Sequence, residues 1–482
     1  MSRLLLKVAF LSFAIAICCG RCASAAESPA AQAVSDSAAQ LEPIQYNHPG
    51  LAVDLGVGLW AWPLPMDYDH DGDLDLIVSC PDKPYNGTYF FENPRVKSPK
   101  QSVRSPEPAV DKNPQPSTLN TQPIFKPAVR IANGPSNVQV SYIDGEPVVM
   151  TPAKIYADFR QEQYDNPIKL PLPEKIDPQY KRTRANQWKL LDWDHDGDLD
   201  VIVGLGVWDD YGWDDAWDEN GHWKNGPLHG FVYLIENQTP SPPIASAGPT
   251  KSSRVESPES RETTGTASLQ QRLAPLATAK FAAPRKLTTS DGHPIDVYGM
   301  PSPNFADFDG DGDLDLICGE FMDGFTWFQN TGSESQMELA SGRKLIDPVA
   351  YAATDSKLPP LHMDLQMITP VALDWDGDGR IDLVCGDEDG RVALIHNRGE
   401  MITANLDPAF SPPEYFQQQA TDVKFGALVT PVGVDWDGDG DEDIVCGNSA
   451  GYIALVENLN GEAVPKWASP KLLKEALRVD SF

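Results

Sequence analysis

The sequence predicts an all-β chain built from a repeated two-strand unit, and three observations lead to this prediction. An acidic nine-residue pattern, D-x-D-x-D-G-x-x-D, occurs five times. Each copy is followed by an apolar, β-branched run, a turn and a second apolar run that ends in asparagine. The 482 residues also include 43 prolines and 37 glycines, which disfavour long uninterrupted helices.

The repeated unit is expected to be a loop followed by a β-hairpin. The acidic loops begin at Asp67, Asp192, Asp307, Asp374 and Asp435. The second apolar runs end at Asn93, Asn237, Asn330, Asn397 and Asn458. An internal repeat of this kind indicates one repeated architecture rather than several unrelated domains.

The spacing of the repeats predicts a β-propeller. The first aspartates are 125, 115, 67 and 61 residues apart, so a compact unit is close to the length of one propeller blade. Segments between the hairpins, at 125–131, 281–287 and 467–473, are expected to form outer strands. Arranging such sheets around an axis protects their edges. We therefore expect about five to seven four-stranded blades over residues 44–470, followed by a C-terminal tail at 471–482.

The two long intervals contain stretches of low complexity. Residues 94–123 are rich in proline and serine, and residues 238–279 are rich in serine, threonine, proline and alanine. Neither composition can bury a core, so both are expected to be disordered insertions. The segment 124–160 retains apolar runs and is expected to add strands.

The acidic loops are expected to bind Ca²⁺. Positions 1, 3, 5 and 9 are carboxylates in all five copies, and position 6 is always glycine. Crowded carboxylates repel unless a cation neutralises them, and hard oxygen ligands in a flexible turn suit Ca²⁺. A main-chain oxygen at position 7 is expected to complete the shell, since the fourth loop has Arg380 there. The expected ligands are Asp67, Asp69, Asp71, Asp75, Asp192, Asp194, Asp196, Asp200, Asp307, Asp309, Asp311, Asp315, Asp374, Asp376, Asp378, Asp382, Asp435, Asp437, Asp439 and Asp443.

Position 12 of the alignment excludes an EF-hand, which requires a carboxylate there and a following helix. The residues at this position are Val78, Val203, Cys318, Cys385 and Cys446. Because the cysteines replace valines within a strand, they are expected to be buried apolar side chains rather than parts of a disulfide framework. The aromatic residue at position 2 is expected to pack between blades.

These loops resemble the FG-GAP/VCBS repeats, the calcium-loop β-propellers of integrin α-chain heads and many exported bacterial proteins. The resemblance covers most of residues 44–470 outside the two low-complexity stretches, and it implies Ca²⁺ on the four aspartates of each loop. Integrin-type heads have seven blades, whereas five acidic loops are found here. The resemblance leaves the activity open, because the family includes adhesion heads, lectin-like modules and polysaccharide lyases.

The second repeat carries a tryptophan-rich insertion at 206–230. Aromatic rings beside carboxylates and guanidinium groups are typical of sugar-binding clefts. The candidate ligand-binding residues are Arg182, Arg184, Trp208, Trp213, Trp217 and Trp223. A polysaccharide lyase would also need a base, for which His222 and His229 are the candidates. The alternative is a long hairpin that covers one face of the propeller.

The first 26 residues have a short cationic start, an apolar run and an A-x-A pattern, which together are typical of a secretory signal peptide. We therefore expect a secreted, periplasmic or cell-surface protein with no transmembrane segment in the mature chain. Its formal charge of −32 argues against a nucleic-acid partner. Of this charge, −24 lies in the five loops, so the acidity mainly reflects cation sites.

The leading functional hypothesis is an exported, calcium-binding scaffold for binding or adhesion, with a glycan or a protein as its ligand. The first alternative is a polysaccharide lyase or hydrolase that uses the insertion at 206–230. The second is a purely structural surface protein.

Overall fold

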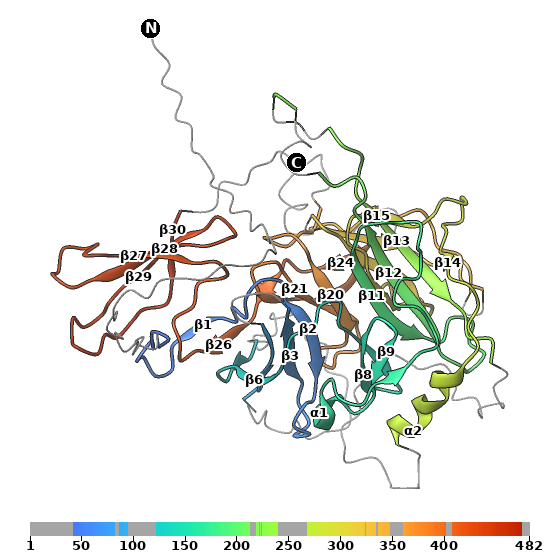
Figure 1. Ribbon diagram of the computed structural model, residues 1–482, viewed down its shortest axis with the longest axis horizontal. Helices are drawn as coiled ribbons and strands as arrows, with labels where there is room; N and C mark the ends of the chain where they lie inside the picture. The colour runs from blue at the N-terminus through green and yellow to red at the C-terminus, as the bar shows by residue number, and fades with distance from the viewer. Residues whose placement is uncertain are drawn as a thin grey trace, which may run out of the picture. The chain divides into compact units, whose positions relative to one another are not determined.

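The computed structural model describes residues 42–81, 86–94, 122–212, 218–220, 222, 224–239, 268–322, 324–333, 336–347, 360–401 and 407–474. The predicted signal peptide and most of both low-complexity stretches lie outside these residues. From Ile44 onward the chain forms one unit. The described part is all-β, as predicted, with three short helical segments (Figure 1). They are α1 (Phe159–Glu162), α2 (Leu269–Leu273) and the 3₁₀ helix η3 (Ala274–Thr278).

The described residues contain six antiparallel sheets of four or more strands. The first sheet consists of β2 (Trp62–Met66), β3 (Asp75–Cys80), β4 (Gly87–Phe91) and β6 (Val129–Ala132). The second consists of β7 (Gln139–Ile143), β8 (Glu146–Thr151), β9 (Lys154–Tyr156) and β10 (Ile168–Lys169). The third consists of β11 (Thr183–Leu191), β12 (Asp200–Val207) and β13 (His229–Ile235), with β14 (Arg285–Lys286) and β15 (Asp296–Tyr298) both paired to β13.

In each of the other three sheets, as in the first, neighbouring strands follow one another in the order of the chain. The fourth consists of β16 (Ser302–Ala306), β17 (Asp315–Gly319), β18 (Phe325–Phe328) and β19 (Arg343–Lys344). The fifth consists of β20 (Thr369–Leu373), β21 (Asp382–Gly386), β22 (Val392–Ile395) and β25 (Glu414–Tyr415). The sixth consists of β27 (Thr430–Val434), β28 (Asp443–Gly447), β29 (Ile453–Val456) and β30 (Lys471–Lys474). Smaller sheets are formed by β1 (Ala52–Asp54), β26 (Gln417–Gln419) and β5 (Ile124–Phe125), and by β23 (Asn397–Met401) and β24 (Pro408–Phe410).

Every acidic loop joins the first two strands of its sheet, and the second strand begins at position 9. A strand thus follows each loop, as expected. The second sheet has no acidic loop. Its first two strands meet at Asp144 and Gly145, which both have positive φ values (52° and 77°), as a tight hairpin turn requires. This extra sheet accounts for much of the long first interval between repeats.

Five of the six sheets pack face to face in an order that returns to its start. The strand β2 contacts β7, β7 contacts β11, β11 contacts β16, β16 contacts β20, and β20 contacts β2. Each interface is an apolar cluster; at the closing one, Val384 of the fifth sheet lies in the same cluster as Leu76 and Val78 of the first. The core of the chain is therefore divided among the interfaces between sheets.

Glycines near the ends of the second strands permit this close packing. A Cβ at Gly386 would lie 2.3 Å from the main-chain oxygen of Ala61, and one at Gly319 would lie 2.6 Å from Cδ of Pro370. A Cβ at Gly447, at the same position of the sixth sheet, would have its nearest neighbour, Oγ1 of Thr430, at 3.4 Å. The sixth sheet therefore lacks this packing at its equivalent position.

Only one face of the sixth sheet is covered by a core cluster in the described part of the chain. Ile444 and Cys446 of β28 pack with Tyr46 from the start of the unit. On the opposite face, Val432 of β27 is 63% exposed, whereas its equivalent in the fifth sheet, Val371, is 1% exposed. The two strands share a local pattern, but they differ in what packs against them.

The second low-complexity stretch ends earlier than expected. Residues 268–279 are ordered: Ser268 and Gln271 form a capping box at α2, and Leu273 and Leu276 are buried in the core cluster of the third sheet. These two leucines pack against the core, although the composition of the surrounding residues predicted no such contact. The predicted C-terminal tail likewise begins later, because residues 471–474 form β30, which pairs with β29.

The four described cysteines, Cys80, Cys318, Cys385 and Cys446, are buried, as predicted for apolar side chains. Outer strands form within two of the three segments expected to supply them and at the end of the third. None of the helices in the described part of the chain is long and apolar enough to cross a membrane.

Candidate metal centres

The last aspartate of each acidic loop ties the loop to its hairpin. Asp75 is fully buried; its Oδ2 accepts the backbone N–H of Tyr68 at 3.0 Å and its Oδ1 accepts that of Asn93 at 2.8 Å. The same pair of hydrogen bonds is made by Asp200, Asp382 and Asp443. The asparagine that ends each hairpin is therefore held by the carboxylate at position 9.

In four of the loops, three aspartates lie close enough together to hold a cation. Asp69 and Asp71 accept backbone N–H groups two residues further on, and Gly72 has a φ of 95° that favours glycine. In each group, one oxygen atom from every residue lies within 4.8 Å of the others. These groups are Asp67, Asp69 and Asp71; Asp192, Asp194 and Asp200; Asp307, Asp309 and Asp311; and Asp374, Asp376 and Asp378.

Buried carboxylate oxygens without a partner show that the loops fit a cation. Oδ1 of Asp67, Oδ1 of Asp192 and Oδ2 of Asp315 are buried and accept no hydrogen bond. Burial is also the main cause that raises the pKa of Asp75 to about 7 and of Asp315 to about 8. A divalent cation would stabilise the charged forms of these groups, and oxygen-only donors are the set that Ca²⁺ prefers.

The aspartate at position 7 has a buried side-chain oxygen that the sequence did not reveal. The expectation was that this residue offers only its main-chain oxygen. In all four loops with aspartate there, a side-chain oxygen is buried without a partner: Asp73, Asp198, Asp313 and Asp441. Burial and then the neighbouring Asp196 raise the pKa of Asp198 to about 7. The available signal was that four of the five loops have aspartate at this position.

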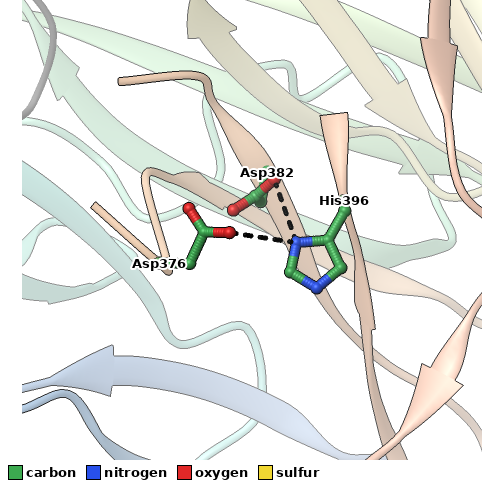
Figure 2. Close-up of side chains that lie close together, drawn as sticks. All are labelled: Asp376, Asp382 and His396. Atoms are coloured by element: carbon green, nitrogen blue, oxygen red, sulfur yellow. Dashed lines mark ion pairs between the residues drawn. The ribbon is translucent and has the colours of Figure 1, made fainter. Parts of the chain in front are cut away.

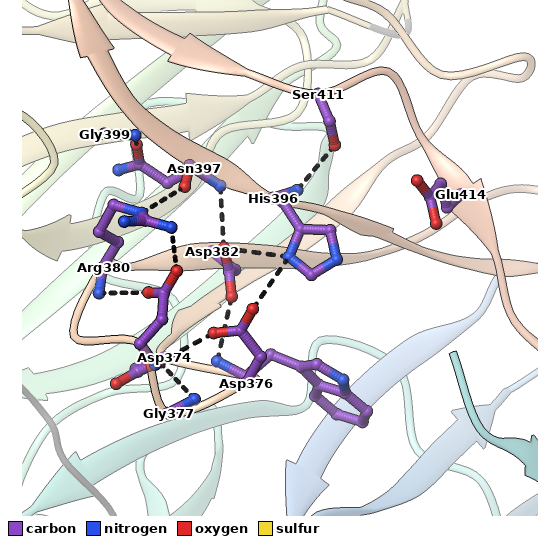
Figure 3. A network of polar contacts seen from close by, with 12 residues as sticks. Asp374, Asp376, Gly377, Arg380, Asp382, His396, Asn397, Gly399, Ser411 and Glu414 are labelled. Atoms are coloured by element: carbon purple, nitrogen blue, oxygen red, sulfur yellow. Dashed lines mark hydrogen bonds and ion pairs between the residues drawn. The ribbon is translucent and has the colours of Figure 1, made fainter. Parts of the chain in front are cut away.

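The fourth loop differs from the others because it supplies its own cation (Figure 3). The guanidinium of Arg380 pairs with Asp378, its Nε donates to the main-chain oxygen of Asn397 at 2.9 Å, and its backbone N–H donates to Asp378 at 2.9 Å. Beside the loop lies His396, whose pKa is raised, chiefly by a hydrogen bond to Asp382.

The tryptophan-rich neighbourhood is partly a packing arrangement. Trp208 is 4% exposed; its Nε1 donates to the main-chain oxygen of Gly299 at 2.7 Å, and the guanidinium of Arg184 lies 4.9 Å from its ring centroid. Trp208 therefore offers little free ring surface to a sugar. Arg182 is exposed and donates from Nη1 to the main-chain oxygen of Tyr211 at 2.9 Å.

The two candidate bases are each paired with their own aspartate. Nδ1 of His222, on an exposed loop, lies 3.4 Å from Oδ2 of Asp218. Nδ1 of His229, on β13, lies 2.6 Å from Oδ2 of Asp296, and its ring stacks on Phe231. Three further candidate ligand-binding residues lie outside the described part of the chain: Trp213, Trp217 and Trp223.

An open cavity of about 410 Å³ lies between elements of the third and fourth sheets. Asp296, the partner of His229, lines it together with Tyr298, and Glu320 and Lys344 form an ion pair in its lining. No local sequence pattern indicates this cavity, because its lining comes from three separate segments between 289 and 344.

The comparisons with known proteins give little further evidence. No protein-family model and no curated protein matches the chain. Among solved structures, the chain matches a lectin of Agrocybe aegerita described as specifically recognising non-reducing terminal N-acetylglucosamine. The match has 16% identity and a TM-score of 0.27, and it covers 86% of this chain and 80% of the lectin. At this TM-score the match assigns neither a fold nor a ligand.

Proposed function

We propose that the chain is a calcium-stabilised β-propeller of the FG-GAP/VCBS type that acts as an exported binding scaffold. The observation that carries the proposal is the set of buried, unpartnered carboxylate oxygens in the repeated loops. Such oxygens are costly unless a cation or a proton compensates them. The closed order of five packed sheets supports the propeller part of the proposal.

Calcium in these loops would act mainly on the fold. Each loop connects the two innermost strands of a sheet, and its last aspartate holds the end of the hairpin. Neutralising the loop removes the repulsion that opposes this arrangement, so metal binding is coupled to folding.

A thermal melt tests the structural role of calcium. Metal-free protein is compared with the same sample in millimolar CaCl₂, with NaCl of matched ionic strength as the control. We expect CaCl₂ to raise the melting temperature by many degrees and NaCl to have little effect. Equal melting temperatures in the two salts would contradict the proposed role.

For the ligand, we propose a glycan bound at the open cavity beside Asp296. The cavity combines the ring of Tyr298 with carboxylates and Lys344, a mixture that suits the apolar face and the hydroxyls of a sugar. A glycan array probed with calcium-loaded protein should give a ligand that Tyr298→Ala no longer binds. The control is Tyr211→Ala, next to Arg182; loss of binding only in this variant would move the site to the tryptophan-rich neighbourhood.

The enzyme alternative rests on His229, which is hydrogen-bonded to Asp296 in the lining of this cavity. A carboxylate partner orients an imidazole that acts as a base, as a polysaccharide lyase needs. Acidic polysaccharides incubated with the protein would then give unsaturated products that absorb in the ultraviolet, and His229→Gln would abolish them. Absence of product across such a panel would favour the scaffold.

A further inference from the structure

A histidine lies beside two carboxylates of the fourth acidic loop. Nδ1 of His396 is 3.6 Å from Oδ1 of Asp382 and 3.8 Å from Oδ2 of Asp376 (Figure 2). One ligand atom from each of the three residues lies within 4.8 Å of the others. When two ligand atoms each lie about 2.1 Å from the same ion, and the angle at the ion is tetrahedral or wider, the two atoms are roughly 3.4–3.8 Å apart. The spacing therefore suits three ligands of one cation.

All four carboxylates of this loop accept hydrogen bonds from the protein. Asp374 accepts the backbone N–H groups of Gly377 at 2.8 Å and Gly379 at 3.0 Å. Both oxygens of Asp378 are held by Arg380, one by its backbone N–H and the other by its guanidinium. Asp382 accepts the backbone N–H groups of Trp375 at 3.2 Å and Asn397 at 2.8 Å, and Asp376 accepts that of Asp378 at 3.1 Å. These two carboxylates are therefore set apart by facing the imidazole, not by a lack of partners.

The equivalent position in the other loops carries an oxygen-bearing side chain. In the third loop it is Gln329, whose Nε2 donates to Oδ2 of Asp309 at 2.9 Å. Asp309 holds the same place in its loop as Asp376 does in the fourth. The remaining loops have Glu92, Glu236 and Glu457. Imidazole nitrogen is a ligand for Zn²⁺ and similar transition metals, whereas Ca²⁺ prefers oxygen.

Ser411 and Glu414 lie on the side of His396 away from the loop (Figure 3). The backbone N–H of His396 donates to Oγ of Ser411 at 3.0 Å, and its side chain is 22% exposed. The carboxylate of Glu414 lies on the opposite side of the ring from Asp376 (Figure 3). Metal-binding imidazoles commonly have a carboxylate near the second nitrogen, which orients the ring.

We propose that the fourth loop binds a divalent transition metal ion of the Zn²⁺ class through Nδ1 of His396 and the carboxylates of Asp376 and Asp382. This inference builds on the proposed cation loops, of which the other four would bind Ca²⁺. Water would complete the coordination of the transition metal.

The test uses protein saturated with Ca²⁺ and titrated with ZnCl₂ by calorimetry and with CoCl₂ by visible absorbance. Wild-type protein should bind one equivalent of Zn²⁺ tightly and should give a Co²⁺ absorption band that reports nitrogen ligation. His396→Gln installs the residue of the third loop, so the fold should tolerate it. It should weaken Zn²⁺ binding at least about tenfold and remove the Co²⁺ band. Asp376→Asn, at an exposed position, should also weaken Zn²⁺ binding.

The matched control is His222→Gln, which alters an exposed histidine beside Asp218. Zn²⁺ binding that survives His396→Gln, or that is lost with His222→Gln, would overturn the proposal. A separate Ca²⁺ titration distinguishes the two proposals. Zn²⁺ bound through His396 without any Ca²⁺ binding would contradict the proposed calcium scaffold alone, whereas Ca²⁺ binding without a Zn²⁺ site would contradict this inference alone.

Discussion

The backbone N–H of Asn93 donates to Oδ1 of Asp75 at 2.8 Å, and this bond joins the end of a hairpin to the last residue of its acidic loop. Four of the five loops pair both carboxylate oxygens of this residue with backbone donors in the same way. The carboxylate at position 9 therefore has a structural role as well as a place among the proposed cation ligands.

Asp75→Asn should destabilise the protein even without calcium. The carboxylate of Asp75 accepts one backbone N–H group on each of its two oxygens, whereas an amide has only one acceptor oxygen. One buried N–H group is therefore left without an acceptor, which costs about 1–3 kcal/mol. Asp71→Asn is the control, because Asp71 is a proposed cation ligand that does not hold the hairpin. Denaturant unfolding in chelator should show the loss for Asp75→Asn and little loss for Asp71→Asn. Equal unfolding free energies for the two variants would contradict the structural role.

Gly386→Ala should be strongly destabilising because it crowds the interface between the fifth and first sheets. The new Cβ would lie 2.3 Å from the main-chain oxygen of Ala61, and overpacking of this kind costs about 1–3 kcal/mol or more. Gly447→Ala, at the equivalent position of the sixth sheet, meets its nearest atom at 3.4 Å and should cost less. Calorimetric melts of both variants check the difference. A larger effect at Gly447 would show that the sixth sheet packs more tightly than it does in this structure.

Asp389 should make stability fall as the pH rises. Burial is the main cause that raises its pKa from 3.8 to about 7. Between about pH 4 and pH 7 the folded state therefore binds more protons than the unfolded state. The contribution of protonated Asp389 to the free energy of unfolding is complete below this pH range. It is lost as the pH rises through the range, by at most about 1.4 kcal/mol per pH unit. Asp389→Asn should reduce this slope, measured as unfolding free energy against pH.

The control for this pH effect is Asp209, whose pKa is lowered, mainly by the backbone N–H of Arg182. Its contribution has the opposite sign, because it is present above the unfolded pKa and is lost as the pH falls. Asp209→Asn should therefore remove a stabilisation seen at neutral pH. A pH slope that Asp389→Asn leaves unchanged would assign the effect to other groups.

The local structure was largely predictable from the sequence, because five aligned copies reveal which positions face a loop and which lie in a strand. The packing of one sheet against another was not predictable from the sequence. Val371 and Val432 both follow Thr-Pro and precede an acidic loop, yet one is buried and the other exposed. The difference depends on a neighbouring sheet that is distant in sequence.

The candidate site was predictable to the same degree. The acidic positions of the loops follow from repetition, whereas the burial of the Asp198 side-chain oxygens at position 7 depends on packing that a sequence does not show. Trp208 matched the composition of a sugar site but packs against Arg184 instead. His396 stands next to the asparagine that ends its hairpin, and only the pairing of strands brings it beside Asp376.

Counting bound calcium tests the central proposal most directly. Metal-free protein is titrated with CaCl₂ by calorimetry, and the bound ions are then measured by atomic emission after desalting. We predict one Ca²⁺ for each of the four loops that have aspartate at position 7, with one fewer after Asp194→Asn in the second loop. Protein that retains no Ca²⁺, or the same number of ions in that variant, would contradict the assignment of these loops as calcium sites.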